Sequence, residues 1–233
     1  ALVTDVPDYW AKADARLLTA YAEQGDITAP ASFIVHSRDE VNKALRLGRP
    51  FFVDIVRDGV AVFEPDQQPF ERPVVLDPAE ALKAATSSYA EWFKSADDFY
   101  ALAKHAIAEK RLNAAAFVMH QAAERLYHCV LLVRKLYSPK SHKLNFLRAQ
   151  AEQNDPALTA AWPRSSRIEQ RRFELLRRAY VEARYSPQYV VTEEELAWLA
   201  ERVGVLQELV RASCEAQLEA LRAAVQGKTS GGA

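Results

Sequence analysis

Apolar residues recur every three or four positions through most of the chain, from residue 78 to about residue 225. Over this stretch Gly and Pro are scarce, and alanine, leucine and charged residues dominate. This spacing predicts helices at 78–94, 96–110, 112–137, 142–153, 156–162, 167–185 and 193–224. Helix 112–137 is apolar on almost every side, so we expect it at the centre of a helical bundle.

The predicted helix starts carry side chains that accept hydrogen bonds from free backbone amides. These N-cap signals are Asp77-Pro78, Asp155-Pro156, Ser166 with Glu169, and Thr192 with Glu195. Helix 193–224 keeps its leucines and valines at near-heptad spacing, which gives one apolar stripe and a charged back. We expect this stripe to pack on the bundle or on a second copy of the chain.

Before residue 65, the spacing of apolar residues fits strands in some segments and helices in others, which predicts α/β structure. Strands are expected at 1–6, 32–36, 51–56 and 60–64, with Asp58-Gly59 as a hairpin turn, and helices at 9–24 and 38–47. The resulting fold class is α+β, mostly α. It comprises a partial α/β domain at 1–64, a proline-rich linker at 65–77, a helical domain at 78–225 and a disordered tail at 226–233. The chain opens without methionine in an apolar run that reads as the middle of a strand, so we expect a fragment.

Charge and cysteine content narrow the function classes. The 30 basic and 31 acidic residues give a net charge of −1, so nucleic acid would have to bind a local patch. No apolar run approaches the ~20 residues of a membrane span, which predicts no membrane partner. Two cysteines are too few for a disulfide framework, and this predicts a cytoplasmic protein.

Three polar residues stand among the apolar residues of the central helix, 112–137. His120, Glu124 and His128 follow at intervals of four and share one edge, with Tyr127 beside them. They are interpreted as a polar seam that lines a nucleotide or RNA pocket, as a hydrogen-bond network that fixes helix packing, or as metal ligands. The packing network is favoured over the pocket, and a metal is favoured least because no second ligand cluster is evident.

A second cluster lies in helix 167–185 and the residues after it. Arg184 falls almost on the apolar stripe of this helix and is expected to point inward near the helix end, where the helix dipole favours a cation. An inward arginine among Tyr180, Tyr185 and Tyr189 suits a phosphate or carboxylate, and an ion pair with Glu124 is the alternative. The basic segment 137–143 is expected to be a solvated surface, or else to line the mouth of a pocket with Arg134.

Three stretches of the sequence resemble the HEPN family, the nucleotide-binding domain shared by higher eukaryotes and prokaryotes. The resemblance rests on AAFVMHQAAERLYHCVLLV at 115–133, LYSPKSHKLNFLR at 136–148 and FELLRRAYVEARYSPQY at 173–189. It implies a helical domain, commonly dimeric, that binds a nucleotide such as GTP or ATP. The ligand-binding residues are predicted to be Arg184, Tyr180, Tyr185, Tyr189, His128, Glu124 and His120.

Residues 32–64 resemble the distal half of the minimal nucleotidyltransferase domain that often precedes HEPN. That family holds a divalent metal on paired carboxylates that follow a Gly-Ser turn, and these residues would come before Ala1. Ser32 stands where related enzymes often place a third carboxylate, and Asp54 is the other acid on a predicted strand. As given, the chain is expected to be inactive as a nucleotidyltransferase.

The resemblance leaves three hypotheses about function. The first is a nucleotide-binding module, the regulatory or substrate-binding half of a nucleotidyltransferase-like protein. The second is part of an active nucleotidyltransferase, whose acceptor is a protein, RNA or small molecule. The third is a ribonuclease toxin of a toxin–antitoxin pair. Related toxins have an arginine followed after four to six residues by histidine, but Tyr189 stands at this histidine position here, and tyrosine is a poor general base.

Overall fold

A computed structural model of the chain describes residues 2–3, 34–61 and 70–230. The chain divides into two compact units, Ala1–Leu76 and Asp77–Ala233. The predicted helix 9–24, Ser32 and residues 62–64 of the last predicted strand lie outside the described residues.

The first unit contains a short parallel strand pair and two helices. Strand β1 (Leu2–Val3) pairs with β2 (Val35–His36), within the strands predicted at 1–6 and 32–36. Helix α2 (Arg38–Arg46) begins as predicted, because the Ser37 hydroxyl accepts from the Glu40 amide and the Glu40 carboxylate accepts from the Ser37 amide.

The predicted strand at 51–56 is wrong. These residues form helix α3 (Pro50–Asp58), which has proline in its first turn and buries Phe52. Proline is already set for the first helical position, and the tertiary setting overrides the strand preference of aromatic and β-branched residues. Asp58-Gly59 is no hairpin turn, because Gly59 has φ −77° and simply ends the helix. Asp54 therefore lies on a helix, where it pairs with Arg57 at 2.9 Å.

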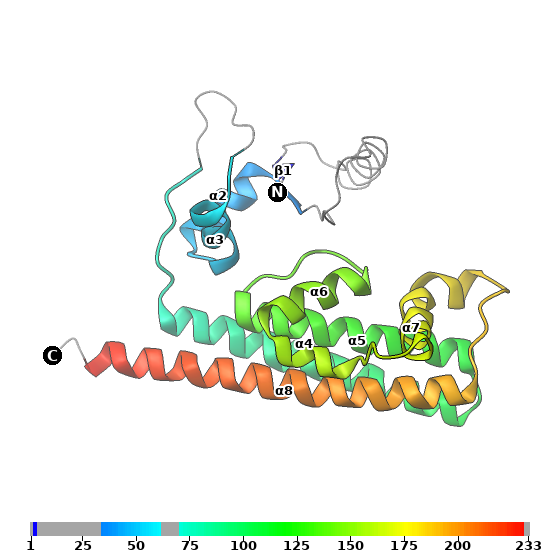
Figure 1. Cartoon of the computed structure of the whole chain (residues 1–233). Helices are drawn as coiled ribbons and strands as arrows, with labels where there is room; N and C mark the ends of the chain where they lie inside the picture. The colour runs from blue at the N-terminus through cyan, green and yellow to red at the C-terminus, as the bar shows by residue number, and fades with distance from the viewer. Residues whose placement is uncertain (1, 4–33, 62–69, 231–233) are drawn as a thin grey trace. The chain divides into compact units, whose positions relative to one another are not determined.

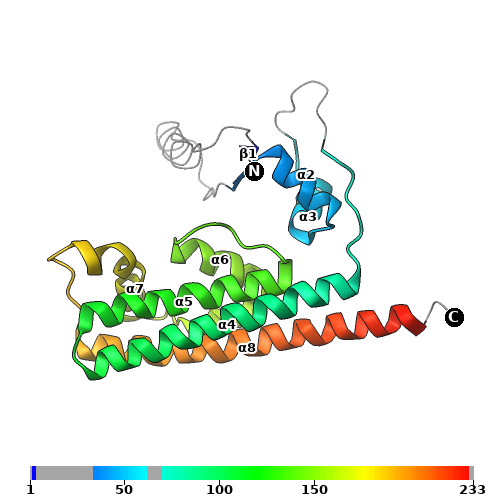
Figure 2. The same cartoon turned by 180° about the vertical axis from the view of Figure 1, so that it is seen from behind.

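The second unit is a helical bundle. Its elements are α4 (Pro78–Ala108), α5 (Leu112–Lys135), α6 (Leu144–Asn154), the 3-10 helix η1 (Pro156–Ala161), α7 (Arg167–Tyr185) and α8 (Glu193–Ser230). Helices α4, α5 and α8 run side by side, whereas α7 crosses them (Figure 1, Figure 2). The predicted break near residue 95 is absent, so α4 is one helix, and α8 continues through residues 226–230 of the predicted disordered tail.

Helix α5 is the centre of this bundle, as its sequence predicted. Met119, Leu126 and Tyr127 are fully buried. The stripe on α8, which includes Leu199 and Leu206, is also buried within this chain, so it packs on the bundle. No helix in the described part of the chain is long and apolar enough to span a membrane.

The end of α5 turns the chain back over the helix. Leu136 adopts a left-handed conformation at φ 51°, which is unfavourable for a residue with a branched side chain and ends the helix. The segment 137–143 then returns along α5, where the Ser138 hydroxyl hydrogen-bonds to Nδ1 of His128 at 2.6 Å. This return brings residues of the α5–α6 connection onto the polar seam of α5.

Candidate functional site

The ring of Tyr180 is the meeting point of the candidate site. Helix α7 carries it and starts at the predicted capping box of Ser166 and Glu169. The half-buried ring stacks on His142 with centroids 5.0 Å apart and lies 5.2 Å from the ring of His120. Residues from α5, from the α5–α6 connection and from α7 therefore meet at one ring.

A buried carboxylate orients His142. Nδ1 of His142 donates to Oε1 of Glu124 at 3.0 Å, while the side chains of His142 and Glu124 are 62% and 5% exposed. Burial raises the pKa of Glu124, and the hydrogen bond from His142 partly offsets this effect. With Nδ1 engaged, Nε2 of His142 is the ring nitrogen left to meet a ligand.

The polar seam of α5 is not fully satisfied. Nδ1 of His120 lies 3.7 Å from Oε2 of Glu124, which is too long for a hydrogen bond. Nε2 of His120 and Oε2 of Glu124 are buried and have no partner among the described residues. Burial, followed by the charges of His142 and Arg184, lowers the pKa of His120 to about 3, so this ring is neutral at physiological pH. Such orphaned buried atoms are uncommon in proteins, so these two atoms are where a bound polar group would find a partner.

His128 belongs to a neighbouring contact and not to the Tyr180 cluster. Its ring lies 5.1 Å from that of Trp92 on α4, and its Nδ1 bonds to Ser138. His120, Glu124 and His128 therefore do not converge on one point. No group of three or more metal-ligating side chains occurs in the part of the chain that the structure describes.

Arg184 does not point inward, as its place on the helix had suggested. It is exposed, and its Nε donates to the carbonyl of Tyr180 at 2.8 Å. The guanidinium lies 4.9 Å from the ring of Phe117, 4.8 Å from Tyr180 and 4.9 Å from Tyr185. We call Arg184 and these three rings the arginine cage. The alternative ion pair with Glu124 is not formed, and no carboxylate of the described chain pairs with Arg184.

The two other tyrosines of this region differ in their surroundings. Tyr185 is 73% exposed and belongs to the cage. Tyr189 is buried, and its hydroxyl donates to the carbonyl of Leu175 at 3.0 Å. Burial raises the pKa of Tyr189 further above its ordinary value, which makes its hydroxyl a still poorer general base near neutral pH. The structure thus separates Tyr189 from the arginine cage, and its role as a ligand-binding residue stays a prediction.

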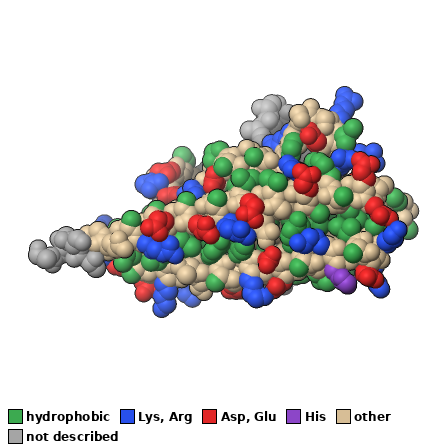
Figure 3. Space-filling view, turned by 90° about the horizontal axis from the view of Figure 1, so that it is seen from below, with side chains coloured by type: hydrophobic (Ala, Val, Ile, Leu, Met, Phe, Trp, Pro, Cys, Tyr) green, Lys and Arg blue, Asp and Glu red, His purple; other side chains and the backbone are tan. Residues whose placement is uncertain are grey.

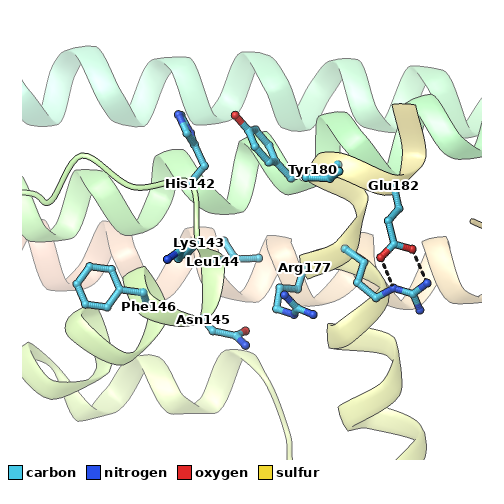
Figure 4. Close-up of a pocket in the computed structure, with 10 residues that line it drawn as sticks. His142, Lys143, Leu144, Asn145, Phe146, Arg177, Tyr180 and Glu182 are labelled. Carbon is cyan, nitrogen blue, oxygen red and sulfur yellow. Dashed lines mark hydrogen bonds and ion pairs between the residues drawn. The ribbon is translucent and has the colours of Figure 1, made fainter. Parts of the chain in front are cut away.

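A cleft of about 390 Å³ opens beside Tyr180, between the start of α6 and the last turns of α7 (Figure 4). His142, Lys143 and Phe146 line one side, and Arg177 and Tyr180 the other. Figure 4 shows the rings of His142 and Tyr180 next to each other at its upper end. The cleft therefore offers aromatic surface next to the arginine cage, while Arg177 and Arg178 in its lining are paired with Glu174 and Glu182.

The charge at this site is local. In the view of Figure 3, basic and acidic side chains are interspersed over the surface, as the net charge of −1 suggests. Arg134, proposed from the sequence as a pocket residue, instead contacts Ser213 and Asp155. An anion would therefore be attracted by the arginine cage, and not by the molecule as a whole.

Sequence reasoning missed several residues of the site. His142 was placed in a basic surface segment, and only the turn at Leu136 reveals that it returns to Glu124. Phe117 and Phe146 lie in predicted helices and were not singled out. The seam was the signal that could have found His142, because a buried carboxylate on a central helix requires a partner.

Two comparisons with known proteins bear on this site. The family model described as "HEPN domain" matches residues 89–213, a range that contains Glu124, His142, Tyr180 and Arg184. No curated protein matches the chain.

Proposed function

Because the chain belongs to the HEPN domain family, we propose that its helical unit binds a nucleotide, with Arg184 as the phosphate contact. The arginine cage is the observation that carries this proposal. Its rings and the carbonyl of Tyr180 hold the guanidinium in place, and no acid of the described chain neutralises it. A fixed, uncompensated guanidinium is well suited to a phosphate.

The neighbouring groups support the same ligand. The cleft beside Tyr180 presents aromatic surface from Phe146 and a cation from Lys143. Nε2 of His142 can bind a further polar atom, since Glu124 holds its Nδ1. GTP and ATP are the ligands we expect, because each combines an aromatic base with a phosphate chain.

Replacing Arg184 by alanine is expected to weaken GTP and ATP binding roughly tenfold, because a hydrogen bond to a charged group contributes about 1.5 kcal/mol. Isothermal titration calorimetry measures the effect. The matched control is Arg171→Ala, which removes an exposed arginine from the same helix, where it lies 3.8 Å from Glu195. Equal affinities of the wild type and Arg184→Ala would sink the assignment.

A second candidate function is cleavage of RNA, and the pair of His142 and Glu124 favours it. An exposed histidine oriented by a buried carboxylate is a typical general base. His142 Nε2 would accept the proton of a ribose 2′-hydroxyl as its oxygen attacks the adjacent phosphorus. The 5′-oxygen would leave with a proton from water, giving a 2′,3′-cyclic phosphate and a 5′-hydroxyl, while Arg184 stabilises the charged phosphorus centre.

This second candidate is tested with a labelled oligoribonucleotide incubated without added metal. We expect shortened products that end in a cyclic phosphate, and a loss of at least 100-fold in rate for His142→Asn, in line with the typical contribution of a general base. A deoxyribonucleotide of the same sequence is the control, since it lacks the 2′-hydroxyl. An intact RNA strand after prolonged incubation from pH 5 to 9 would rule out cleavage and leave the binding proposal standing.

The wider setting of the unit is inferred from sequence resemblance. We propose that it is the regulatory or substrate-binding half of a nucleotidyltransferase-like protein, as the likeness of residues 32–64 suggests. Homodimer formation is likewise proposed, because HEPN domains are commonly dimeric.

A further inference from the structure

The two cysteines of the sequence meet in the core of the helical unit. Cys129 lies on α5 and Cys214 on α8, and both are fully buried and free. Their Sγ atoms are 4.0 Å apart, although 85 residues separate them along the chain. We call these two residues the cysteine pair. It has no role in the function proposed above.

The distance between the two sulfurs brings a covalent bond within reach. It is the distance of two thiols in contact, whereas the sulfurs of a disulfide are about 2.05 Å apart. They would therefore have to approach by about 2 Å, and rotation of a cysteine side chain between its staggered positions moves the sulfur by such a distance. Because α5 and α8 pack side by side, a bond here would join two long helices of the bundle.

The surroundings of the cysteine pair keep it reduced and slow to react. A hydrogen bond with Cys129, followed by burial, raises the pKa of the Cys214 thiol, and the thiolate is the form that reacts. Arg134 of α5 acts in the opposite direction, because its positive charge favours the thiolate. Its Nη1 lies 3.4 Å from the hydroxyl of Ser213, the residue before Cys214. Oxidation is therefore possible but requires that an oxidant reach the core.

Tyr89 on α4 covers this part of the core. Its half-buried ring packs on the same buried cluster and lies 5.2 Å from the ring of Phe93. The guanidinium of Arg211 on α8 lies 5.3 Å from the Phe93 ring, one helical turn before Cys214. Burial, followed by nearby acidic groups that include both cysteines, raises the pKa of Tyr89 to about 12. Movement of this ring is thus a short route from solvent to the sulfurs.

A bond between the cysteines would close a loop that carries much of the candidate site. The loop from Cys129 to Cys214 contains His142, Tyr180 and Arg184, whereas Glu124 lies on α5 outside it. Closing a loop of this length restricts the unfolded chain strongly. The oxidised protein would therefore unfold less readily than the reduced one.

We propose that hydrogen peroxide oxidises the cysteine pair to a disulfide within the folded bundle, and that this bond braces α5 against α8. One sulfur, as its thiolate, attacks a peroxide oxygen and becomes a sulfenic acid, and the other peroxide oxygen leaves as water. The second sulfur then attacks the first and displaces the hydroxyl as another water. The two thiols lose two electrons and two protons, and the peroxide takes up both. This inference is independent of nucleotide binding.

The test treats the folded full-length chain with hydrogen peroxide and follows its intact mass, its linked peptides and its melting temperature. The mass should fall by about 2 Da as two hydrogens are lost, with Cys129 and Cys214 in one linked peptide. The melting temperature should rise by about 5–10 °C, because the unfolded chain loses entropy. Dithiothreitol should reverse both changes. Cys129→Ala and Cys214→Ala should show neither the mass loss nor the rise.

Two tyrosine variants test whether the reaction takes place in the folded bundle. Tyr89→Ala should speed disulfide formation severalfold, because it uncovers the sulfurs. The matched control is Tyr100→Ala, which removes another half-buried tyrosine of α4, whose hydroxyl donates to the carbonyl of Ala200 on α8 at 2.8 Å. It should leave the rate close to that of the wild type.

Three results would overturn the proposal. The first is a folded wild type that keeps both thiols in peroxide while the urea-unfolded chain forms the bond. The second is a disulfide that does not raise the melting temperature. The third is equal acceleration by Tyr89→Ala and Tyr100→Ala, which would mean that oxidation follows general loosening of the bundle.

Discussion

Replacing Tyr127 by alanine is expected to lower the free energy of unfolding of the helical unit by about 3–5 kcal/mol. The ring is fully buried at the centre of α5, and its hydroxyl accepts a hydrogen bond of 2.7 Å from Nε1 of Trp162. The truncation therefore leaves a cavity in the core and also a buried indole N–H without its acceptor. Urea unfolding followed by circular dichroism measures the change.

Two control variants separate the effect of the cavity from the effect of the lost hydrogen-bond acceptor. Tyr127→Phe keeps the ring and removes the acceptor alone, so it is expected to cost about 1–2 kcal/mol. Tyr185→Ala removes a tyrosine that is 73% exposed and should stay within about 0.5 kcal/mol of the wild type. A Tyr127→Ala variant as stable as Tyr127→Phe would contradict the central position of α5.

The helical unit could be predicted closely because its signals are local. Helix α7 begins and ends where the sequence predicted, since the capping box of Ser166 and Glu169 marks its start and Pro187 follows its end. The centre of the bundle was equally clear, because only a surrounded helix is apolar on nearly all sides. These features need no knowledge of distant residues.

Residues 51–58 show where local signals conflict. Their aromatic and β-branched residues favour a strand, while Pro50 in the first helical turn and buried Phe52 are compatible with a helix. The Asp-Gly pair at 58–59 also favoured the strand, because this pair is a typical hairpin turn between two strands. Strand preference depends on the neighbouring strands and sheet face, which the sequence of one segment does not contain.

The candidate site was harder to predict because its geometry depends on long side chains and distant contacts. The position of Arg184 on the helix gives the direction of its Cβ, but the guanidinium folds back four residues to the carbonyl of Tyr180. His142 reaches Glu124 only because Leu136 adopts a left-handed conformation that no sequence rule assigns to leucine. The sequence thus singled out Glu124, Tyr180 and Arg184, but neither His142 nor the direction of the Arg184 side chain.

Mild acid is expected to destabilise the helical unit strongly. Burial lowers the pKa of His120 to about 3 and that of His128 to about 4, below the ordinary value of 6.5. Between 6.5 and these values the unfolded chain binds more protons than the folded chain, so the free energy of unfolding falls as pH falls. Each histidine contributes about 1.4 kcal/mol per pH unit below about pH 6. The raised pKa of Glu124 acts in the opposite direction, because its protonation in acid favours the folded chain.

Urea unfolding at pH 8, 6 and 5 tests this expectation. His120→Gln and His128→Gln should each reduce the loss between pH 6 and pH 5 by about 1.4 kcal/mol, whatever their stability at pH 8. His105→Gln, which replaces an exposed histidine on α4, should lose as much as the wild type. Identical losses in all four proteins would show that neither buried histidine is held neutral.

The same measurement bears on the arginine cage. Arg184 lies against the Tyr180 ring, which His120 also contacts, and its charge is one cause of the lowered pKa of His120. Removing that charge in Arg184→Ala should therefore raise the pKa of His120 and make the protein less sensitive to acid, although burial remains the larger cause. This effect is expected without any ligand, so it tests the position of Arg184 independently of nucleotide binding. An unchanged acid response in Arg184→Ala would mean that its guanidinium does not act on His120.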